Sequence, residues 1–108
     1  MAKAKVRRIR IVRIPYGEAP EWVRREWVGL ELWVEDDPRD VFEQKLGQEA
    51  IGVLSGSHDQ ENSGGYSVGY EEALLILSQK SHRAAQWFRQ NTKPISFLFG
   101  KQFCEVVK

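Results

Sequence analysis

The clearest alternation of apolar and polar residues runs from Trp27 to Glu35. Its apolar members on one phase are Val28, Leu30, Leu32 and Val34. Successive side chains of a β-strand point to opposite faces, so a period of two predicts a strand with one face in the core. On this reading Trp27 and Trp33 lie on the other face of the strand.

A second strand is predicted over residues 6–14, where the alternation changes phase. Ile9 and Ile11 share one phase, whereas Val12 and Ile14 share the other. A phase change of this kind indicates a bulge or a break in the strand. The intervening arginines then point outward. If this strand pairs with the one over 27–35, Glu31 and Glu35 are expected cross-strand partners for Arg8, Arg10 or Arg13.

Local signals between these strands and the middle of the chain predict shorter elements. Pro20 precedes a short helix or structured loop, in which Glu21 and Arg25 have the spacing of an i,i+4 pair. Asp37-Pro38, followed by an amphipathic stretch and Gly47, predicts a helix over 38–46. A third strand is expected over 49–55, and the polar, glycine-rich residues 56–65 are expected to form a mobile loop.

The last third of the chain predicts a helix followed by two strands. From Tyr70 to Asn91 apolar residues recur at intervals of three and four, as in an amphipathic helix, and Ser81 is placed to cap a second helix if the segment breaks. Residues 95–107 read as a β-hairpin with Gly100-Lys101 in a type II′ turn. In that hairpin Cys104 points into the core.

These elements predict one α+β domain covering residues 1–108. The expected architecture is a small five-stranded antiparallel sheet or partly open barrel, with one main helix between the third and fourth strands. The helix position favours an OB-like barrel, and the long excursion over 15–26 favours an SH3-like barrel. The two classes stay open at this point.

Composition places the chain among globular proteins that fold without a metal or disulfide. Of its 108 residues, 42% are apolar and 29% are charged, a balance that supports a packed core. The single cysteine excludes an internal disulfide and a cysteine-based zinc site. No apolar run is long enough for a membrane helix, and the N-terminus lacks the apolar core of a secretion signal. A cytoplasmic protein without membrane contact or cofactor is expected.

Catalytic chemistry has one weak candidate in the sequence, a loop site around His58 and Asp59. Adjacent residues in a loop do not orient each other as a catalytic pair must, so an ordinary polar loop is the simpler interpretation. His82 has no second ligand at i+3 or i+4, and no metal site is expected. The glycines match neither a phosphate loop nor a dinucleotide fingerprint. An enzyme is therefore the third hypothesis.

The uneven distribution of charge suggests nucleic-acid binding as an alternative function. Residues 1–17 carry six bases and no acid, and residues 18–72 carry four bases and fourteen acids. The candidate contacts to phosphate are Arg7, Arg8, Arg10 and Arg13. The net charge of +1 and the neighbouring glutamates weigh against this function.

Protein binding is the leading hypothesis because three tryptophans fall within a short stretch. Trp22, Trp27 and Trp33 are the candidate interface residues, since large aromatic side chains are enriched where binding energy concentrates. The alternative is that residues 15–26 fold back and cover them. A protein partner or self-association is therefore expected to use a tryptophan-bearing face of the sheet.

Overall fold

The computed structural model describes residues 5–14, 19–46, 64–92 and 96–108, and it has an α+β architecture with a partly open barrel. Within these residues the five strands form one antiparallel sheet in the order β4-β3-β2-β1-β5. The elements in chain order are β1 (Lys5–Ile11), α1 (Glu21–Trp27), β2 (Glu31–Asp37), α2 (Arg39–Leu46), β3 (Gly65–Val68), α3 (Tyr70–Lys80), α4 (His82–Asn91), β4 (Phe97–Gly100), the 3₁₀ helix η1 (Lys101–Phe103) and β5 (Cys104–Val106).

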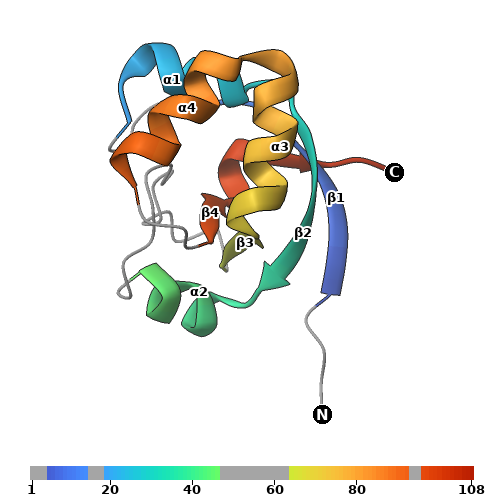
Figure 1. Ribbon diagram of the computed structural model, residues 1–108. Helices are drawn as coiled ribbons and strands as arrows, with labels where there is room; N and C mark the ends of the chain where they lie inside the picture. The colour runs from blue at the N-terminus through green and yellow to red at the C-terminus, as the bar shows by residue number, and fades with distance from the viewer. Residues whose placement is uncertain (1–4, 15–18, 47–63, 93–95) are drawn as a thin grey trace.

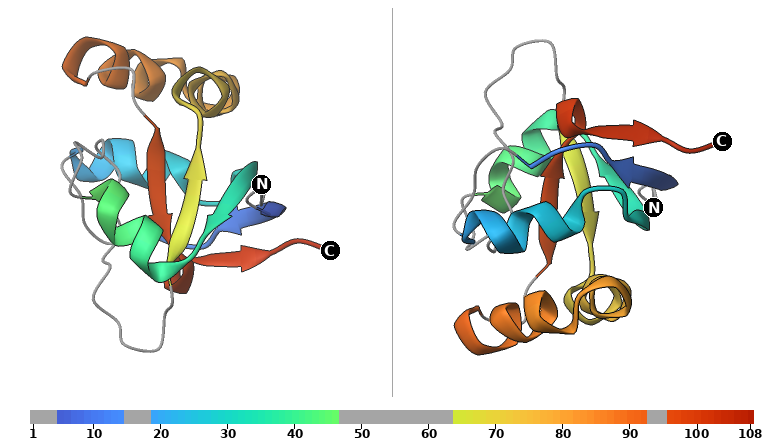
Figure 2. Two further views of the ribbon diagram at one scale, coloured as in Figure 1. Left: turned by 90° about the horizontal axis from the view of Figure 1, so that it is seen from below. Right: turned by 90° about the horizontal axis from the view of Figure 1, so that it is seen from above.

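The sheet curls so strongly that its two halves run in different directions. Figure 1 shows β1 and β2 as one long curved wall, with α1, α3 and α4 gathered at one end and α2 at the other. In the views of Figure 2, β3 and β4 cross the direction of β1 and β5 steeply. Because the strands curl in this way, α1 packs against α3 and α4 inside the bend. The outer surface of β1 and β2 faces away from all three helices.

An aromatic cluster holds the helices to the sheet. Trp27, at the end of α1, is completely buried, and its ring centroid lies 5.7 Å from Phe88, 5.0 Å from Phe97 and 5.5 Å from Phe99. Edge-to-face and tilted contacts of this kind add to the free energy gained by burying the rings. Val23 lies one helical turn before Trp27 and is also fully buried, so α1 presents this stripe to the core.

The helical segment from Tyr70 to Asn91 divides at Ser81, the break that the sequence left open. Ser81 has an extended backbone, and its hydroxyl oxygen accepts a hydrogen bond from the backbone N–H of Ala84 at 3.2 Å. An N-cap serine satisfies an amide that the first helical turn leaves without a partner. The prediction that Ser81 caps a second helix is therefore confirmed.

The predicted strand over 27–35 is wrong at its beginning. Trp27 belongs to α1, and Gly29 has a φ of 92°. A positive φ turns the chain sharply and suits glycine, which has no Cβ. β2 therefore starts at Glu31, after this turn, and the apparent alternation through Val28 combined residues of a helix, a turn and a strand.

The predicted hairpin over 95–107 is also wrong. β4 and β5 lie at opposite ends of the sheet order, and β5 pairs with β1, with Cys104 opposite Ile11. Gly100 has a φ of −68°, whereas the first position of a type II′ turn requires a positive φ. The chain instead passes through η1, which carries it from one edge of the sheet to the other.

The remaining predictions of local structure have mixed outcomes. The helix over 38–46 is confirmed as α2, which begins one residue after Pro38. The predicted strand over 49–55 lies outside the described residues, as does most of the predicted loop over 56–65. The end of that loop is wrong, because Gly65 begins β3 and pairs with Asp37. A Cβ on Gly65 would overlap the ring of Phe42, which explains why glycine stands there.

Candidate functional site

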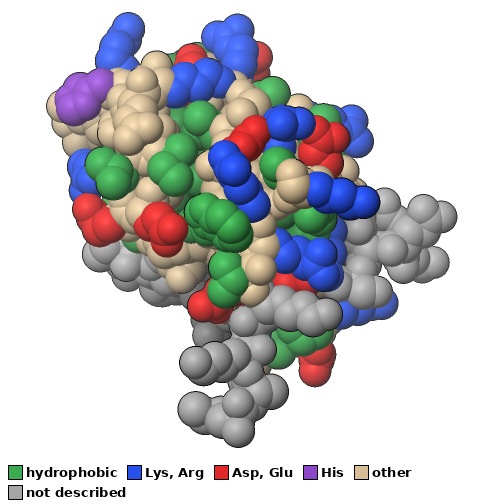
Figure 3. All heavy atoms as spheres, turned by 90° about the vertical axis from the view of Figure 1, so that its right-hand side faces the viewer, with side chains coloured by type: hydrophobic (Ala, Val, Ile, Leu, Met, Phe, Trp, Pro, Cys, Tyr) green, Lys and Arg blue, Asp and Glu red, His purple; other side chains and the backbone are tan. Residues whose placement is uncertain are grey.

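The outer face of β1, β2 and β5 carries three of the side chains that the sequence singled out, Arg8, Arg10 and Trp33. In the β1–β2 register Val6 lies opposite Glu35, Arg8 opposite Trp33 and Arg10 opposite Glu31. The alternate residues of the two strands, such as Ile9 and Leu32, point to the core. Since side chains directly opposite on one face are neighbours, these three pairs form a continuous surface. In Figure 3 hydrophobic side chains lie near the middle of the molecule's visible face, beside a group of mixed basic and acidic residues.

The three tryptophans of the predicted interface do not share a face. Trp33 is 56% exposed on the outer face of β2, whereas Trp27 is fully buried, so the expectation of an exposed Trp27 is wrong. Trp27 points inward because it belongs to the buried stripe of α1 and not to a strand. Trp22 is 38% exposed on α1, and the guanidinium of Arg83 lies 5.6 Å from its ring centroid. The surface around Trp33 therefore contains one of the three predicted residues.

A groove of about 320 Å³ opens beside Trp33, where the pairing between β2 and β3 ends. The last pair of that register toward the start of β2 is Glu35 with Ser67. Continuation would place Trp33 opposite Gly69, but Gly69 is the N-cap of α3 and the chain turns away there. The groove lies where β3 no longer pairs with β2. Its walls are Val6, Trp33, Val34, Glu35, Ser67, Val68, Gly69, Glu72 and Ser96.

The main chain of Trp33 also faces this gap. Ile11 donates its N–H to Leu30 O at 3.0 Å, on the β2 side, whereas Arg8 O accepts from Val107 N at 2.9 Å, on the β5 side. Backbone groups alternate in direction along an antiparallel strand. Arg8 and its register partner Trp33 therefore direct their N–H and C=O groups away from each other. Those of Trp33 point toward the side of β3, where the strand pairing has ended.

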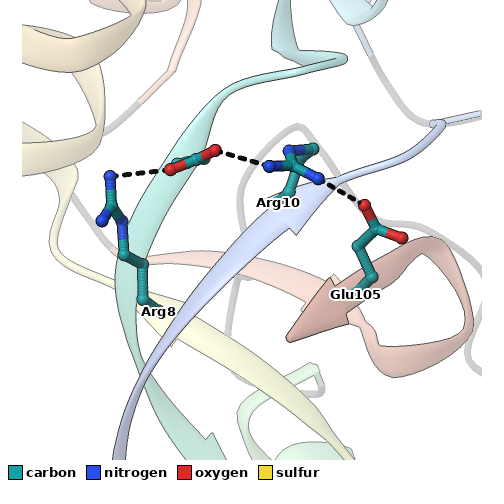
Figure 4. A network of polar contacts seen from close by, with 4 residues as sticks. Arg8, Arg10 and Glu105 are labelled. Atoms are coloured by element: carbon teal, nitrogen blue, oxygen red, sulfur yellow. Dashed lines mark hydrogen bonds and ion pairs between the residues drawn. The ribbon is translucent and has the colours of Figure 1, made fainter. Parts of the chain in front are cut away.

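The arginines proposed for nucleic-acid binding are held by carboxylates of the same sheet. Arg8 Nη2 lies 2.7 Å from Glu31 Oε1, and Arg10 contacts both Glu31 Oε2 at 2.8 Å and Glu105 Oε1 at 2.7 Å. Figure 4 shows this chain of contacts from Arg8 to Glu105. The hydrogen bond from Arg10 is the main reason that the pKa of Glu31 is lowered. The prediction that Glu31 pairs with Arg8 or Arg10 is confirmed. The same expectation for Glu35 is wrong, because no arginine of the described residues contacts its carboxylate.

The other two candidate arginines do not join Arg8 and Arg10 in one basic surface. Arg7 points to the inner side, where its Nε lies 2.7 Å from Asp36 Oδ2, and Lys101 Nζ lies 2.7 Å from Asp36 Oδ1. The guanidinium of Arg13 lies 5.1 Å from the ring centroid of Phe103. The Asp36 contacts join β1, β2 and η1. Their geometry indicates a structural role.

The candidates for catalysis gain no support in the described part of the chain. His58 and Asp59 lie outside it, and His82 is exposed on α4. Across residues 5–14, 19–46, 64–92 and 96–108 there is no group of three or more histidine, cysteine or acidic residues that could hold a metal. Burial raises the pKa of the Cys104 thiol to about 12, which keeps it protonated and unsuited to nucleophilic attack.

Comparison with known proteins gives no indication of the function. No protein family, curated protein or solved structure matches the chain. None of the helices in the described segments combines the length and the apolar character that a bilayer crossing requires.

The sequence gives no sign of a binding role for three residues that line the groove, Glu35, Glu72 and Gly69. Of these, the charge pattern singles out only Glu35, as an expected partner for arginine. Trp33 and Glu72 are 39 positions apart in the sequence. They line one groove because β3 pairs with β2 and leads directly into α3, whose first turn contains Glu72. The alternation over 27–35 did place Trp33 and Glu35 on one outward face, and that part of the prediction is confirmed.

Proposed function

We propose that this protein is a non-enzymatic binding domain that engages a protein partner through the outer face around Trp33. The observation that supports this function is an indole that is 56% exposed and lines a groove, with Val6, 65% exposed, also among the lining residues. Tryptophan is enriched at the centres of protein interfaces, where a pocket and a surrounding polar rim exclude water. The Arg8–Glu31–Arg10–Glu105 contacts supply such a rim.

An extended segment of the partner suits this surface. Because the N–H and C=O groups of Trp33 face the gap beside β2, a peptide lying there has main-chain groups within its reach. Addition of an extended peptide to an open strand position provides affinity through the backbone and selectivity through side-chain pockets. The groove beside Trp33 is the side-chain pocket in this arrangement.

Nucleic-acid binding is the second candidate, and the charge of the outer face weighs against it. The residues of β1, β2 and β5 on this face include the bases Arg8 and Arg10 and the acids Glu31, Glu35 and Glu105. Nonspecific affinity for nucleic acid comes from basic groups that replace counterions on the phosphates. Arginines that already bind carboxylates must give up those contacts first.

We further propose that the barrel is SH3-like and that the protein works in the cytoplasm. Four strands follow one another in chain order across the sheet and the fifth returns to the first. This order favours the SH3-like class over the Greek-key order of an OB-like barrel. The single cysteine is consistent with a reducing compartment.

Selection from a library of random peptides displayed on phage tests the proposed function. Peptides enriched on the natural protein are synthesised with a fluorophore, and their binding is followed by anisotropy. Trp33→Ser should weaken binding about thirtyfold or more, since a central aromatic contributes about 2 kcal/mol or more at such sites. Trp22→Ser is the matched control, because Trp22 is also partly exposed but lies on α1.

Two outcomes contradict the proposal. Enriched peptides whose affinity is unchanged by Trp33→Ser would place the binding surface elsewhere. Salt-sensitive binding of mixed-sequence oligonucleotides that is lost on changing Arg8 and Arg10 to Ser would favour the nucleic-acid function instead. Sedimentation of the unliganded protein distinguishes a separate partner from a second copy. A dimer that Trp33→Ser converts to a monomer would show that the occupant is another copy of this chain.

A further inference from the structure

The Trp33 groove has a negative electrostatic character. Its nine lining residues include two glutamates, Glu35 on β2 and Glu72 in the first turn of α3, and no lysine, arginine or histidine. The other lining side chains are apolar or carry a hydroxyl. Two carboxylates beside a partly apolar wall create a local field that attracts a cation.

These glutamates differ from their neighbours in having no basic partner among the described residues. Glu71 precedes Glu72 in the same helical turn, but its carboxylate accepts two hydrogen bonds from Arg89, at 3.1 and 2.8 Å. Glu31 lies on the same face of β2 as Glu35, but it contacts Arg8 and Arg10. The positive end of the α3 dipole offsets part of the charge of Glu72. Glu35 and Glu72 therefore give the groove a negative charge that no basic residue of its lining neutralises.

The indole of Trp33 adds a surface that favours a cation. Elsewhere in the described chain, basic groups lie over aromatic rings at 5.1 Å (Arg13 and Phe103) and 5.6 Å (Arg83 and Trp22). No such group lies over Trp33 among the described residues. Arg8, which lies directly opposite in the register, contacts Glu31 instead. The face of an indole attracts guanidinium and ammonium groups more strongly than other aromatic rings do.

We infer that the groove binds an arginine or lysine side chain of the partner segment, with its cationic group between Trp33 and the carboxylates of Glu35 and Glu72. This inference rests on the proposed function, because it names the side chain that the docking surface selects. The aliphatic part of the same side chain contacts Val6 and Val68, whose methyl groups line the groove. A partner segment with a basic residue in an extended, partly apolar stretch meets these conditions.

Titration of the ¹⁵N-labelled protein with N-acetyl-arginine amide, followed by NMR, tests the inference without knowledge of the natural partner. The matched probe is N-acetyl-citrulline amide, which keeps the shape of arginine and lacks its charge. We expect saturable shifts of the Trp33 indole and of the Glu35 and Gly69 amides, with a Kd on the order of 1–10 mM. The Trp22 indole should not move.

Two glutamate variants separate the groove from general surface charge. Glu72→Gln should weaken binding of the arginine probe about threefold to fivefold, in line with the small contribution of one exposed charge. Glu71→Gln removes the same charge from the same helical turn, but Glu71 does not line the groove. The affinity of the Glu71→Gln variant for the arginine probe should stay close to that of the natural protein.

The outcomes distinguish this inference from the proposed function on which it depends. Equal shifts with arginine and citrulline at Trp33 would overturn charge selection and leave Trp33 as a docking site. Phage-selected peptides that need Trp33 but lack a basic residue would also overturn charge selection and leave Trp33 as a docking site. If the arginine probe moves no resonance at Trp33, the inference is wrong. If, in addition, no selected peptide depends on Trp33, the proposed function is wrong as well.

Discussion

Arg8 lies directly opposite Trp33 in the β1–β2 register, yet its guanidinium contacts Glu31, with Nη2 2.7 Å from Oε1. A cross-strand arginine is well placed to cover the face of a tryptophan. Glu31 instead holds the guanidinium of Arg8 away from the indole, and the same carboxylate also contacts Arg10. The exposure of Trp33 is therefore linked to a carboxylate that does not itself line the groove.

Removal of Glu31 should change binding at Trp33 through this link. In Glu31→Gln we expect Arg8 to stack on the indole, which would compete with a basic ligand and weaken the binding of Trp33-dependent peptides. The tryptophan emission should shift to shorter wavelength as water is displaced from the ring. Peptide anisotropy and emission spectra of the purified variant check both effects.

The double variant Arg8→Gln/Glu31→Gln is the control for that prediction. It removes the competing cation along with the carboxylate, so the affinity should return toward that of the natural protein. Unchanged affinity in the single variant would contradict the link between Glu31 and Trp33.

The Asp36 contacts should make stability depend on acidic pH. Burial by itself raises the pKa of Asp36, but the hydrogen bonds from Lys101 and Arg7 together outweigh it, and the pKa is lowered. A lowered pKa in the folded state contributes stability that is present above the unfolded pKa of about 4 and is lost as pH falls through the folded pKa. At pH 7 we expect Asp36→Asn to lower the free energy of unfolding by about 1–2 kcal/mol.

Urea titrations from pH 7 to pH 2 check this expectation. The difference in stability between the natural protein and Asp36→Asn should be constant above about pH 5 and should shrink below about pH 4. Glu21→Gln is a suitable control, since Glu21 makes only a 3.8 Å contact with Arg25 on the surface of α1. A pH-independent difference for Asp36→Asn would contradict the assigned role of the carboxylate.

The thiol of Cys104 should be unreactive in the folded protein. Its pKa is raised to about 12 by burial, from an ordinary value of 9.0. At pH 8 the thiolate fraction is then roughly a thousandfold lower than in the unfolded chain. Ellman's reagent should therefore react slowly with the native protein and quickly in concentrated urea. Equally fast reaction in both conditions would contradict burial of the thiol.

The same pKa predicts a loss of stability at alkaline pH. A raised pKa contributes stability that is fully present below the unfolded value of about 9 and is lost as pH rises toward 12. Cys104→Ala lacks this contribution, so the stability of the natural protein relative to this variant should fall between pH 9 and pH 11. Comparing the two proteins at each pH removes the titration of lysines and tyrosines, which they share.

The buried Trp27 should be essential for folding, in contrast to Trp22. Trp27→Ala leaves a cavity among Phe88, Phe97 and Phe99, and we expect it to cost about 3–5 kcal/mol. Trp27→Phe should cost less, because it keeps most of the ring and removes an indole N–H that is buried without a hydrogen-bond partner. Urea denaturation measures both, and Trp22→Ala should change stability little.

The sequence by itself determined the elements that depend on neighbouring residues. The helix α2 after Pro38 and the outward face of Trp33 with Glu35 follow from proline and short-range periodicity. The capping serine at position 81 is also visible in the sequence, which does not decide whether the helix breaks there. The pairing of Arg8 and Arg10 with Glu31 also follows, because it requires only that the first two strands be neighbours. Short-range signals of this kind are carried by a few adjacent side chains.

Only the tertiary structure decided which segments meet. Trp27 is buried because α1 continues to it and Gly29 then turns the chain, and a pattern with a period of two does not reveal that turn. β5 pairs with β1 because η1 leads the chain across the barrel. The residues of β5 do not show by themselves whether this strand pairs with β4 or with β1. The groove exists because β2 and β3 stop pairing at Glu35, which brings Glu72 beside Trp33. Contacts between distant segments depend on the whole curl of the sheet, and no local pattern carries that information.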